Sequence, residues 1–509
     1  MRAVVRRLIC WVLLVSHAVT SAFQHSLRPV ARPSPSLSGW RKHPEPSATC
    51  LSSSRRTLDE DTSSSPRGLT RRQVIEVAVA ATGLGITATG TVEVDPTDYG
   101  LWGILPVGTY RRKKTIRETI VPGQIWTFDQ KFGILNVQVP LRMTVIKLKN
   151  GGLFVYNPIA ATQELVGMVR ELVNEYGPVK YIAVGSVALE HKAYAGVFAQ
   201  KFPTAKVFLQ PGQYSFPINL PDSFLGFPVG RTFNMPRTPD EAPPEWRDEI
   251  EWAVLGPIIS RDGAFGETVF HHKATKTLLV TDTSVQVTDE VPAIYETDSE
   301  PLLYHARDTI TDVVQDTPET QKKGWKRIVL FGLFFTPSAI TIKDADVALK
   351  ERRPDINSDF AGVYPWDWTG DEEASWKALT GNGKPLVAPI LQTLLLNRTP
   401  VEVLDFADKV GSWSFTRIIP AHLKNNLAFN GSDYRKAFGF LEESGVPPGF
   451  PRPLDADLQT LKDAEKSLIE QGAIAPAPPK VGGKFSRAEI VEQTLYRCRK
   501  DICTPKADV

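Results

Sequence analysis

Cysteine is scarce in this chain, which contains only four among its 509 residues. Cys10 and Cys50 lie in the N-terminal region, and Cys498 and Cys503 lie in the C-terminal tail. The body between them therefore cannot hold a Cys₄ or Cys₂His₂ zinc module. The two tail cysteines suit a disulfide in an oxidising compartment. A CxxxxC spacing alone is a weak signal, so we expect a surface pair without chemistry.

The chain also lacks a charge excess and a long apolar run. Its formal net charge is only +2, and the body has no basic stripe, so we expect no nucleic-acid partner. The apolar runs Leu8–Val15 and Ile328–Phe335 are much shorter than the roughly 20 residues that span a bilayer. The second run instead indicates a buried strand or the core of a helix.

The N-terminus has the composition of a targeting sequence. Residues 1–23 combine arginines, a short apolar core and small residues before a candidate cut at Ala22–Phe23, which is typical of a signal peptide. Residues 24–69 are rich in Ser, Pro and Arg, which is transit-peptide composition and will not pack a core. Together they resemble the bipartite presequence of plastid proteins in algae with complex plastids. The alternative is a signal peptide followed by a disordered linker.

Residues 70–90 contain a further targeting pattern. Arg71 and Arg72 precede the small-residue run Val74–Thr89, which resembles a twin-arginine signal for the thylakoid lumen. Glu76 inside the run departs from that pattern, and the alternative is a basic stretch before the first helix of the domain. We therefore expect a plastid (chloroplast) protein, located in the thylakoid lumen or associated with the thylakoid membrane.

The folded body starts near Tyr99 and alternates between strands and helices, which predicts a layered α/β domain. The turn Asn150–Gly151–Gly152 between two apolar stretches is a strong hairpin signal. The domain extends over residues 99–450 with an insertion at 285–400, and residues 451–509 supply a last helix and a basic tail. The predicted strands are 142–148, 153–156, 179–184, 206–209, 250–255, 267–272, 277–281 and 415–420, and the predicted helices are 161–176, 193–202, 401–410 and 454–471.

Ligand-type residues follow three of these strands. Glu190 and His191 lie in a predicted loop after the strand at 179–184, Asp282 follows the strand at 277–281, and His422 follows the strand at 415–420. Open α/β sheets place their chemistry at the carboxyl ends of strands. The sequence therefore predicts a metal site made of these four side chains.

This arrangement resembles the metallo-β-lactamase fold superfamily over residues 142–422, and most closely an uncharacterised branch found in cyanobacteria, algae and plant plastids. The resemblance implies an αββα sandwich with a large insertion before the last core strand. The stretches that carry it are Tyr156–Ala160, Ala188–Lys192, Gln210–Gln213 and Glu267–His272.

The superfamily's motif, His-x-His-x-Asp-His, implies one deleted and one retained metal site. Its two leading histidines fall on Ser186 and Ala188, and the middle histidine falls on Gly263, so all three ligands of one site are lost. Glu190, His191, Asp282 and His422 occupy the positions of the other site. The retained set suits one divalent ion, zinc first and manganese or iron(II) otherwise.

Other candidate residues have more ordinary interpretations. Asn157 occupies a position that often orients a metal ligand, and the alternative is a turn residue before Pro158. His271 and His272 lie on one predicted strand and point to opposite faces, so we expect structural histidines. His305 is expected at the surface. The cluster Trp366–Asp367–Trp368 suits either a substrate lid or, more commonly, tryptophans that anchor the insertion.

Two functions remain compatible with the sequence. One is a single-metal hydrolase that acts on a small ester, thioester, lactone or phosphoester, with a metal-bound water as nucleophile and Asp282 as its base. The other is a non-catalytic plastid or thylakoid scaffold that keeps the fold, with a structural metal or none. The complete retained site favours the hydrolase.

Overall fold

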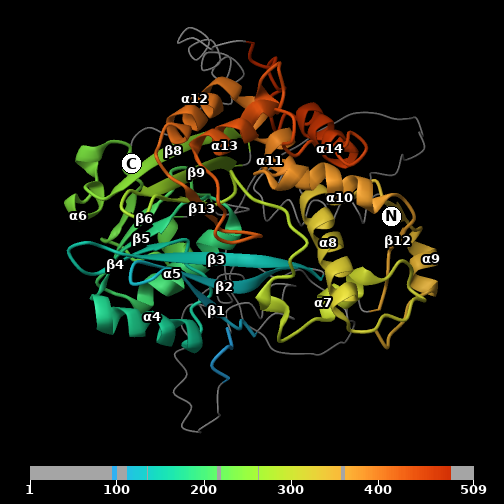
Figure 1. Cartoon of the computed structure of the whole chain (residues 1–509), viewed down its shortest axis with the longest axis horizontal. Coiled ribbons are helices and arrows are strands. Elements are labelled where there is room, and N and C mark those ends of the chain that lie inside the picture. Colours follow the sequence, from blue (N-terminus) through green and yellow to red (C-terminus); the bar gives the residue numbers. More distant parts are fainter. Residues whose placement is uncertain are drawn as a thin grey trace, which may run out of the picture. The chain divides into compact units, whose positions relative to one another are not determined.

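A computed structural model describes residues 95–99, 112–134, 136–214, 219, 221–261, 263–356 and 362–482 of the chain. The predicted targeting segments at 1–90, and the tail with Cys498 and Cys503, lie outside the described residues. Two β-sheets pack face to face in the described body, with helices on their outer faces (Figure 1).

The first sheet has seven strands in the order β1-β2-β3-β4-β5-β6-β7. Pairing is antiparallel from β1 to β4 and parallel from β4 to β7. Its strands are β1 (Ile116–Val121), β2 (Ile125–Ile134), β3 (Val137–Lys147), β4 (Leu153–Tyr156), β5 (Val179–Val184), β6 (Lys206–Leu209) and β7 (Thr232–Asn234).

The second sheet has four strands in the order β13-β10-β9-β8. Strands β8 (Ile250–Ser260), β9 (Gly263–His272) and β10 (Thr277–Val280) are antiparallel neighbours, while β13 (Arg417–Pro420) pairs with β10 in parallel. Val280 lies opposite Pro420 in that pair. The segments that follow β10 and β13 therefore leave the sheet side by side.

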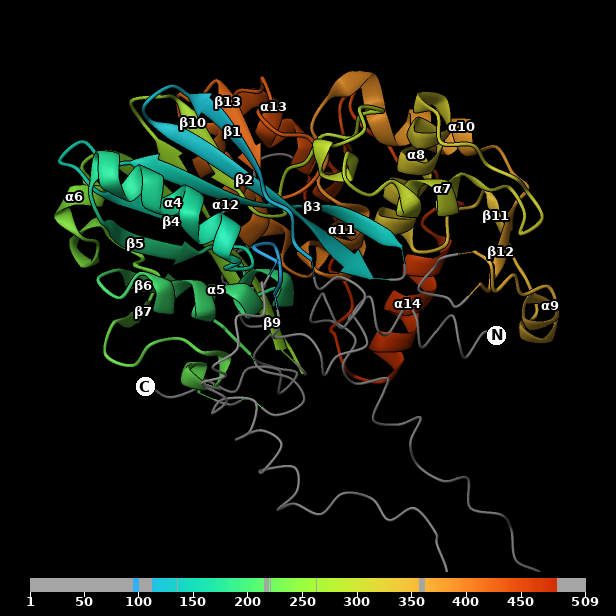
Figure 2. The same ribbon diagram turned by 90° about the horizontal axis from the view of Figure 1, so that it is seen from below.

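Three apolar cores lie between the layers, which pack together through them. Phe154 and Tyr181 of the first sheet meet Phe270 and Leu279 of the second in the core between the sheets. The outer face of the first sheet packs under helices α4 (Gln163–Tyr176) and α5 (Leu189–Lys201). The outer face of the second packs under α11 (Pro389–Leu394), α12 (Pro400–Gly411), α13 (Gly431–Lys436) and α14 (Gln459–Glu470). The expected αββα sandwich is thus confirmed, and Figure 2 shows its layers from below.

The insertion forms a small helical layer with its own core. It contains α7 (Glu300–Ala306), α8 (Pro318–Phe334), α9 (Ala345–Lys350), α10 (Glu372–Thr380) and the strand pair β11 (Ile340–Ile342) and β12 (Trp366–Trp368). The apolar run that begins at Ile328 lies in α8 and is buried as expected. Trp366 and Trp368 are also buried, so they anchor the insertion. None of the described helices has the length and apolar character of a membrane span.

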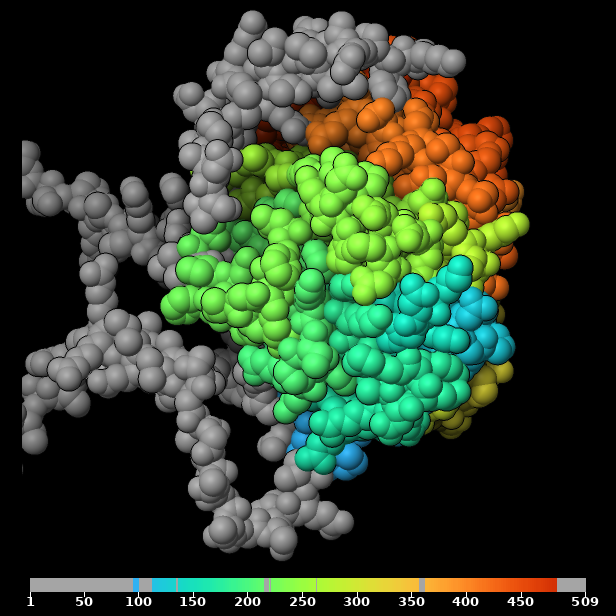
Figure 3. All heavy atoms as spheres, turned by 90° about the vertical axis from the view of Figure 1, so that its left-hand side faces the viewer, coloured from blue at the N-terminus to red at the C-terminus, as the bar shows by residue number. Residues whose placement is uncertain are grey.

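Several boundaries differ from the sequence expectation. The stretch before Asp129, where no strand was predicted, contains β1 and the start of β2. The segment between the strands predicted at 206–209 and 250–255, where no element was predicted, contains the short edge strand β7 and the short helix α6 (Pro244–Arg247). Helix α5 begins at Leu189 rather than near residue 193, so Glu190 and His191 lie in its first turn and not in a loop. Figure 3 shows one face, with teal residues of the first sheet and its helices, green residues of the following segment and orange residues of the later helices.

Candidate metal centre

The four predicted ligands come from the ends of three strands. Strand β5 leads through residues 185–188 into α5, whose first turn carries Glu190 and His191. Asp282 and His422 each stand two residues beyond the paired residues Val280 and Pro420 of two parallel strands. This shared register places their side chains next to each other.

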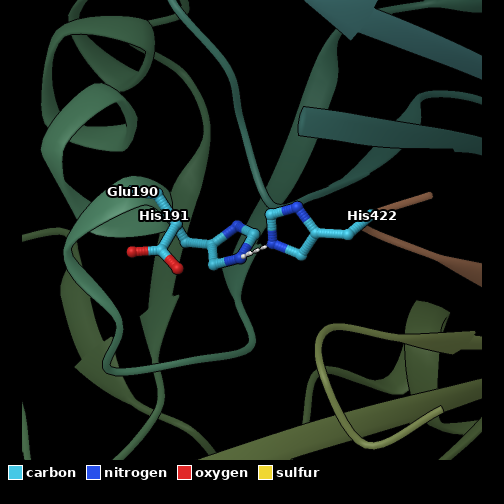
Figure 4. Close-up of side chains that lie close together, drawn as sticks. All are labelled: Glu190, His191 and His422. Carbon is cyan, nitrogen blue, oxygen red and sulfur yellow. Dashed lines mark hydrogen bonds between the residues drawn. The ribbon is translucent and has the colours of Figure 1, made fainter. Parts of the chain in front are cut away.

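The ligand atoms of Glu190, His191 and His422 all lie within 4.8 Å of one another. The two imidazole Nε2 atoms are 3.3 Å apart and point toward each other in Figure 4, with the two ring planes inclined by 63°. An oxygen of Asp282 lies 3.4 Å from Nε2 of His422, so the fourth predicted residue borders this group through one histidine. The structure therefore brings all four residues to one place.

The tautomer of His422 follows from its partner on β3. Its Nδ1 lies 3.0 Å from the carbonyl oxygen of Pro140, which can only accept a hydrogen bond, so Nδ1 carries the proton. Burial lowers the pKa of His422 to about 4, and burial together with His422 lowers the pKa of His191 well below its usual value. Both rings are therefore neutral near pH 7. Nε2 of His422 offers its lone pair to the centre.

The carboxyl groups of the centre have raised pKa values. Burial, together with the neighbouring Asp282, raises the pKa of Glu190 to about 8, and burial raises that of Asp282 to about 7. The Ser186 hydroxyl hydrogen-bonds Asp282 and acts in the opposite direction. The hydroxyl of Ser186 therefore faces the carboxyl group of Asp282.

The donor set fits one divalent cation. Within the described part of the chain, Oε2 of Glu190 and Nδ1 of His191 are buried without a hydrogen-bond partner, although buried polar atoms normally have one. A cation held by Glu190, His191 and His422 would satisfy the carboxylate and would replace the hydrogen bond between the two rings, in which Nε2–H of His191 donates to Nε2 of His422. Imidazole and carboxylate ligands suit zinc, manganese or iron(II).

Asn157 was expected to orient a metal-binding histidine, but its side chain hydrogen-bonds other groups. Its Oδ1 accepts from the backbone N–H of Gly185 at 2.8 Å, and its Nδ2 donates to the Thr281 hydroxyl at 3.0 Å. Asn157 therefore contacts no histidine. It connects the segment after β5 to the residue before Asp282, and its φ of 50° shows that it is also a turn residue.

The other histidines of the described residues, His271, His272 and His305, lie elsewhere. His271 contacts Glu251 and stacks on Trp413, whereas His272 hydrogen-bonds Thr275, so both are buried structural residues as expected. The surface location expected for His305 is wrong, because this residue is fully buried. It stacks on Trp366 at the interface between α7 and β12, and this aromatic cluster of the insertion leaves it no access to solvent.

A cavity of about 600 Å³ borders the segment that follows His422. Residues 423–426 line it together with Asp129 and Arg142 of the first sheet. Glu290 and Trp325 contribute from the insertion. Its volume lies in the range of small-molecule sites, and its position makes the insertion part of the wall.

Two buried charged residues near the centre were not predicted as site residues. Glu267 lies on β9 and Arg142 lies on β3, and both are almost completely inaccessible to solvent. A charged residue within an otherwise apolar strand was the only available signal in the sequence, since ionised side chains are seldom fully buried without partners. Their contacts are described below.

The fold is that of a mixed α/β protein similar to metallo-β-lactamase-like folds. The similar solved structures include the metal-soaked flavodiiron core Flv1 from Synechocystis, with 10% identity and a TM-score of 0.32 over 64% of this chain and 60% of that one. A Thermotoga maritima flavoprotein has 12% identity and a TM-score of 0.32 over 77% and 76%. A Pontibacter korlensis metallo-β-lactamase has 12% identity and a TM-score of 0.25 over 34% and 74%.

Residues 122–440 match the family described as Domain of unknown function (DUF4336), and the chain belongs to this family. The match starts in the turn between β1 and β2 and ends after α13, so it includes the second sheet, the first sheet except β1, the insertion and all four predicted ligands. A search among curated proteins finds no significant match.

Proposed function

We propose that this protein is a single-metal hydrolase of a small ester, thioester, lactone or phosphoester. The observation that carries the proposal is the convergence of Glu190, His191 and His422 from separate segments, with ligand atoms within 4.8 Å of one another. Asp282 borders them at 3.4 Å from His422. When bound, a divalent ion supplies Lewis-acid activation of water and of a carbonyl or phosphoryl oxygen.

The side chains of the centre would have separate roles in the reaction: binding the ion, supplying negative charge and accepting a proton. His191 and His422 hold the ion as neutral nitrogen ligands, and Glu190 supplies negative charge. Asp282, whose pKa burial raises to about 7, takes up a proton near neutral pH and acts as the base. A cavity of about 600 Å³ borders residues 423–426, directly after His422, although none of the four proposed ligands lines it.

Metal analysis of the purified protein tests this proposal. We expect close to one divalent ion per chain, and a large loss of binding in His191→Ala and His422→Ala. His271→Ala is the matched control, since it removes a buried histidine that makes no contact with the centre, and it should keep the ion. Two ions per chain, or an ion retained in both ligand variants, would contradict the assignment.

The alternative is a scaffold that binds a structural ion or none. The enclosure of the centre favours it, because His191 is fully buried and the side chains of His422 and Asp282 are only 15% and 18% exposed. The same preparation separates the two functions. A metal-loaded protein that hydrolyses none of a panel of esters, thioesters, lactones and phosphoesters would be a scaffold. Metal-dependent turnover that Asp282→Asn abolishes would identify the hydrolase.

The location proposed for the protein is the plastid, in the thylakoid lumen or associated with the thylakoid. The composition of residues 1–90 supports it. A fluorescent fusion of the full chain should accumulate in the plastid, and a fusion that stays in the cytosol or is secreted would contradict this. If changing Arg71 and Arg72 to Lys leaves lumenal import intact, the twin-arginine part alone is wrong.

A further inference from the structure

Glu267 binds the backbone of the segment that carries Asp282. Its two carboxylate oxygens accept hydrogen bonds from three consecutive backbone N–H groups, those of Thr281, Asp282 and Thr283, at 2.8, 2.9 and 3.0 Å. The hydroxyl of Thr283 donates a fourth at 2.8 Å. Burial and the neighbouring Asp282 raise the pKa of Glu267 to about 8, but the four donors occupy both oxygens and leave no acceptor for a carboxyl proton, so the geometry favours the ionised, acceptor-only form. The segment after β10 is therefore fixed by one side chain.

The same strand also holds the segment that leads to Glu190 and His191. The backbone N–H of Thr268 donates to the carbonyl oxygen of Gly185 at 2.7 Å, and Ser186 forms a β-bridge with Glu267. Residues 267–268 of the second sheet thus contact both ligand-bearing segments, one through the backbone and one through the Glu267 carboxylate.

Arg142 binds the backbone of the segment that carries His422, as Glu267 binds the segment that carries Asp282. Its guanidinium donates to the carbonyl oxygens of Pro420 at 2.7 Å and Leu423 at 3.0 Å, and its backbone N–H donates to Ala421 at 2.9 Å. Asp129 neutralises the guanidinium at 2.7 Å. The contacts therefore reach the residues on either side of His422.

The segment held by Arg142 has an unusual backbone conformation. Leu423, directly after His422, has a φ of 57°, and a bulky residue seldom occupies this left-handed region. Such strain persists only where the surroundings determine the conformation. The hydrogen bond from Arg142 to the Leu423 carbonyl is one such determinant, and it fixes the direction in which His422 leaves the strand.

We propose that Glu267 and Arg142 are positioning residues that set the geometry of the metal centre before an ion binds. A buried anion orders the N–H groups around Asp282, and a buried cation orders the C=O groups around His422. Because these segments follow adjacent parallel strands, the two residues together fix the relative position of two ligands from the second sheet. This inference rests on the proposed metal site and assigns the residues that preorganise it.

Two other buried charged residues provide matched controls. Arg327 donates to the carbonyl oxygens of His305, Ala306 and Arg307 in the insertion, which is the chemistry of Arg142 at another location. Asp457 is a fully buried carboxylate that accepts from Ser338 and Ser375, in the manner of Glu267. Neither contacts a segment that carries a predicted ligand.

The test uses Co²⁺ as the probe on the full chain, since its visible absorption reports ligand geometry. In Glu267→Gln, an amide group faces N–H donors, and Arg142→Gln loses most of its donors. Both should bind Co²⁺ about 10- to 100-fold more weakly, as expected when an outer-shell partner is lost, with an altered spectrum. The controls Arg327→Gln and Asp457→Asn should lose thermal stability while they keep the wild-type spectrum and affinity.

The outcomes separate the two proposals. If folded Glu267→Gln and Arg142→Gln keep wild-type Co²⁺ affinity and spectrum, the positioning role is wrong and the metal site stands. If the wild-type chain binds no Co²⁺, the metal site itself fails and the positioning role fails with it. Where Arg142→Gln does not fold, Arg142→Lys replaces it, because it keeps the charge and fewer donors. An intermediate affinity supports the proposal, and wild-type affinity overturns it.

Discussion

At the scale of single residues, the metal centre consists of buried ionisable side chains, and burial disfavours the charged form of each. Glu190 and Asp282 have raised pKa values, of about 8 and about 7, because water is excluded from them. Without an ion, the folded protein therefore holds protons that the unfolded chain releases. The contribution of these two carboxyl groups to the free energy of unfolding is present at low pH and is lost as the pH rises through their folded pKa values of about 7 and 8. A divalent cation replaces those protons and reverses this dependence.

Metal affinity should accordingly rise with pH. Between pH 6 and pH 8 the histidines are already neutral, so the protons displaced by the ion come from Glu190 and Asp282. We expect about a tenfold gain in affinity per pH unit for each displaced proton. Calorimetry at pH 6, 7 and 8 measures both affinity and proton release. Glu190→Gln should flatten the rise, whereas a wild-type affinity that does not change with pH would contradict the assigned ligands.

His272 makes a separate contribution to stability in acid. Burial, together with its neighbour His271, lowers the pKa of His272 to about 4. The Thr275 hydroxyl donates to Thr277, so Nδ1 of His272 donates to Thr275 as a neutral ring. Because the folded pKa is depressed, the stability from this residue is complete above pH 6.5 and is lost as the pH falls through 4.

This effect predicts a difference of about 3 kcal/mol for His272 between pH 7 and the acid limit, at 1.36 kcal/mol per pKa unit. His272→Asn keeps a donor near Nδ1 but has no titrating group. Urea unfolding should therefore show a shallower loss of stability between pH 6.5 and pH 4 for this variant than for the wild type. An equal loss in both proteins would show that His272 does not titrate with unfolding.

The residues of the centre could be predicted because their chemistry shows in the sequence. Each is a ligand type in the segment that follows an apolar strand, and the structure brings all of them together. Glu267 and Arg142 could not be predicted in the same way, because their proposed positioning role depends on the backbone groups that they contact in the folded chain. Those contacts join residues that are distant in the chain, such as Arg142 and Pro420. His305 was misplaced because a single histidine carries no signal of burial.

At the scale of elements, periodicity decided what could be predicted. Helix α4 has a buried stripe that includes Leu165, Val169 and Leu172, and its predicted boundaries lie within two residues of the observed ones. Helix α5 lacks such a stripe because it is buried on most sides, including at Glu190 and His191. Its start was therefore missed. Strands β1 and β2 were missed because β1 has no regular alternation of buried and exposed residues and a tight turn joins the two.

Helix α8 offers a sharp test of packing within the insertion. A Cβ at Gly324 would lie 2.0 Å from the carbonyl oxygen of Leu302 on α7, so the two helices approach closely only because this residue is glycine. At Gly332, on the same helix, the nearest atom would be a Val137 methyl carbon at 3.8 Å, an ordinary contact.

Alanine at Gly324 should lower the stability of the protein, whereas alanine at Gly332 should raise it. Gly324→Ala forces α7 and α8 apart and should destabilise the protein by about 1–3 kcal/mol. Gly332→Ala should stabilise it by up to about 1 kcal/mol, because alanine favours the helix and its methyl group fits. Thermal and urea unfolding of the two variants measure both values. A neutral Gly324→Ala would show that α7 can shift away from α8 without cost.

At the scale of the whole molecule, the predicted ligands connect both sheets. Glu190 and His191 depend on the first sheet through β5, while Asp282 and His422 depend on the second through β10 and β13. The αββα arrangement followed from the order of strands and helices and from the family resemblance. The packing of the insertion did not, since its core uses Trp325, Trp366 and other aromatic residues that have no regular spacing.

Because the ligands span both sheets, an ion should stabilise the entire folded body. Binding only to the folded state adds RT ln(1 + [M]/Kd), or about 2.7 kcal/mol at a hundredfold excess over Kd. Thermal unfolding should therefore shift upward as a single transition when zinc is added, and it should shift back with chelator. His422→Ala should unfold at one temperature with or without zinc, while His271→Ala should keep the full shift. A shift confined to one of two separate transitions would mean that the ion joins residues of a single sheet.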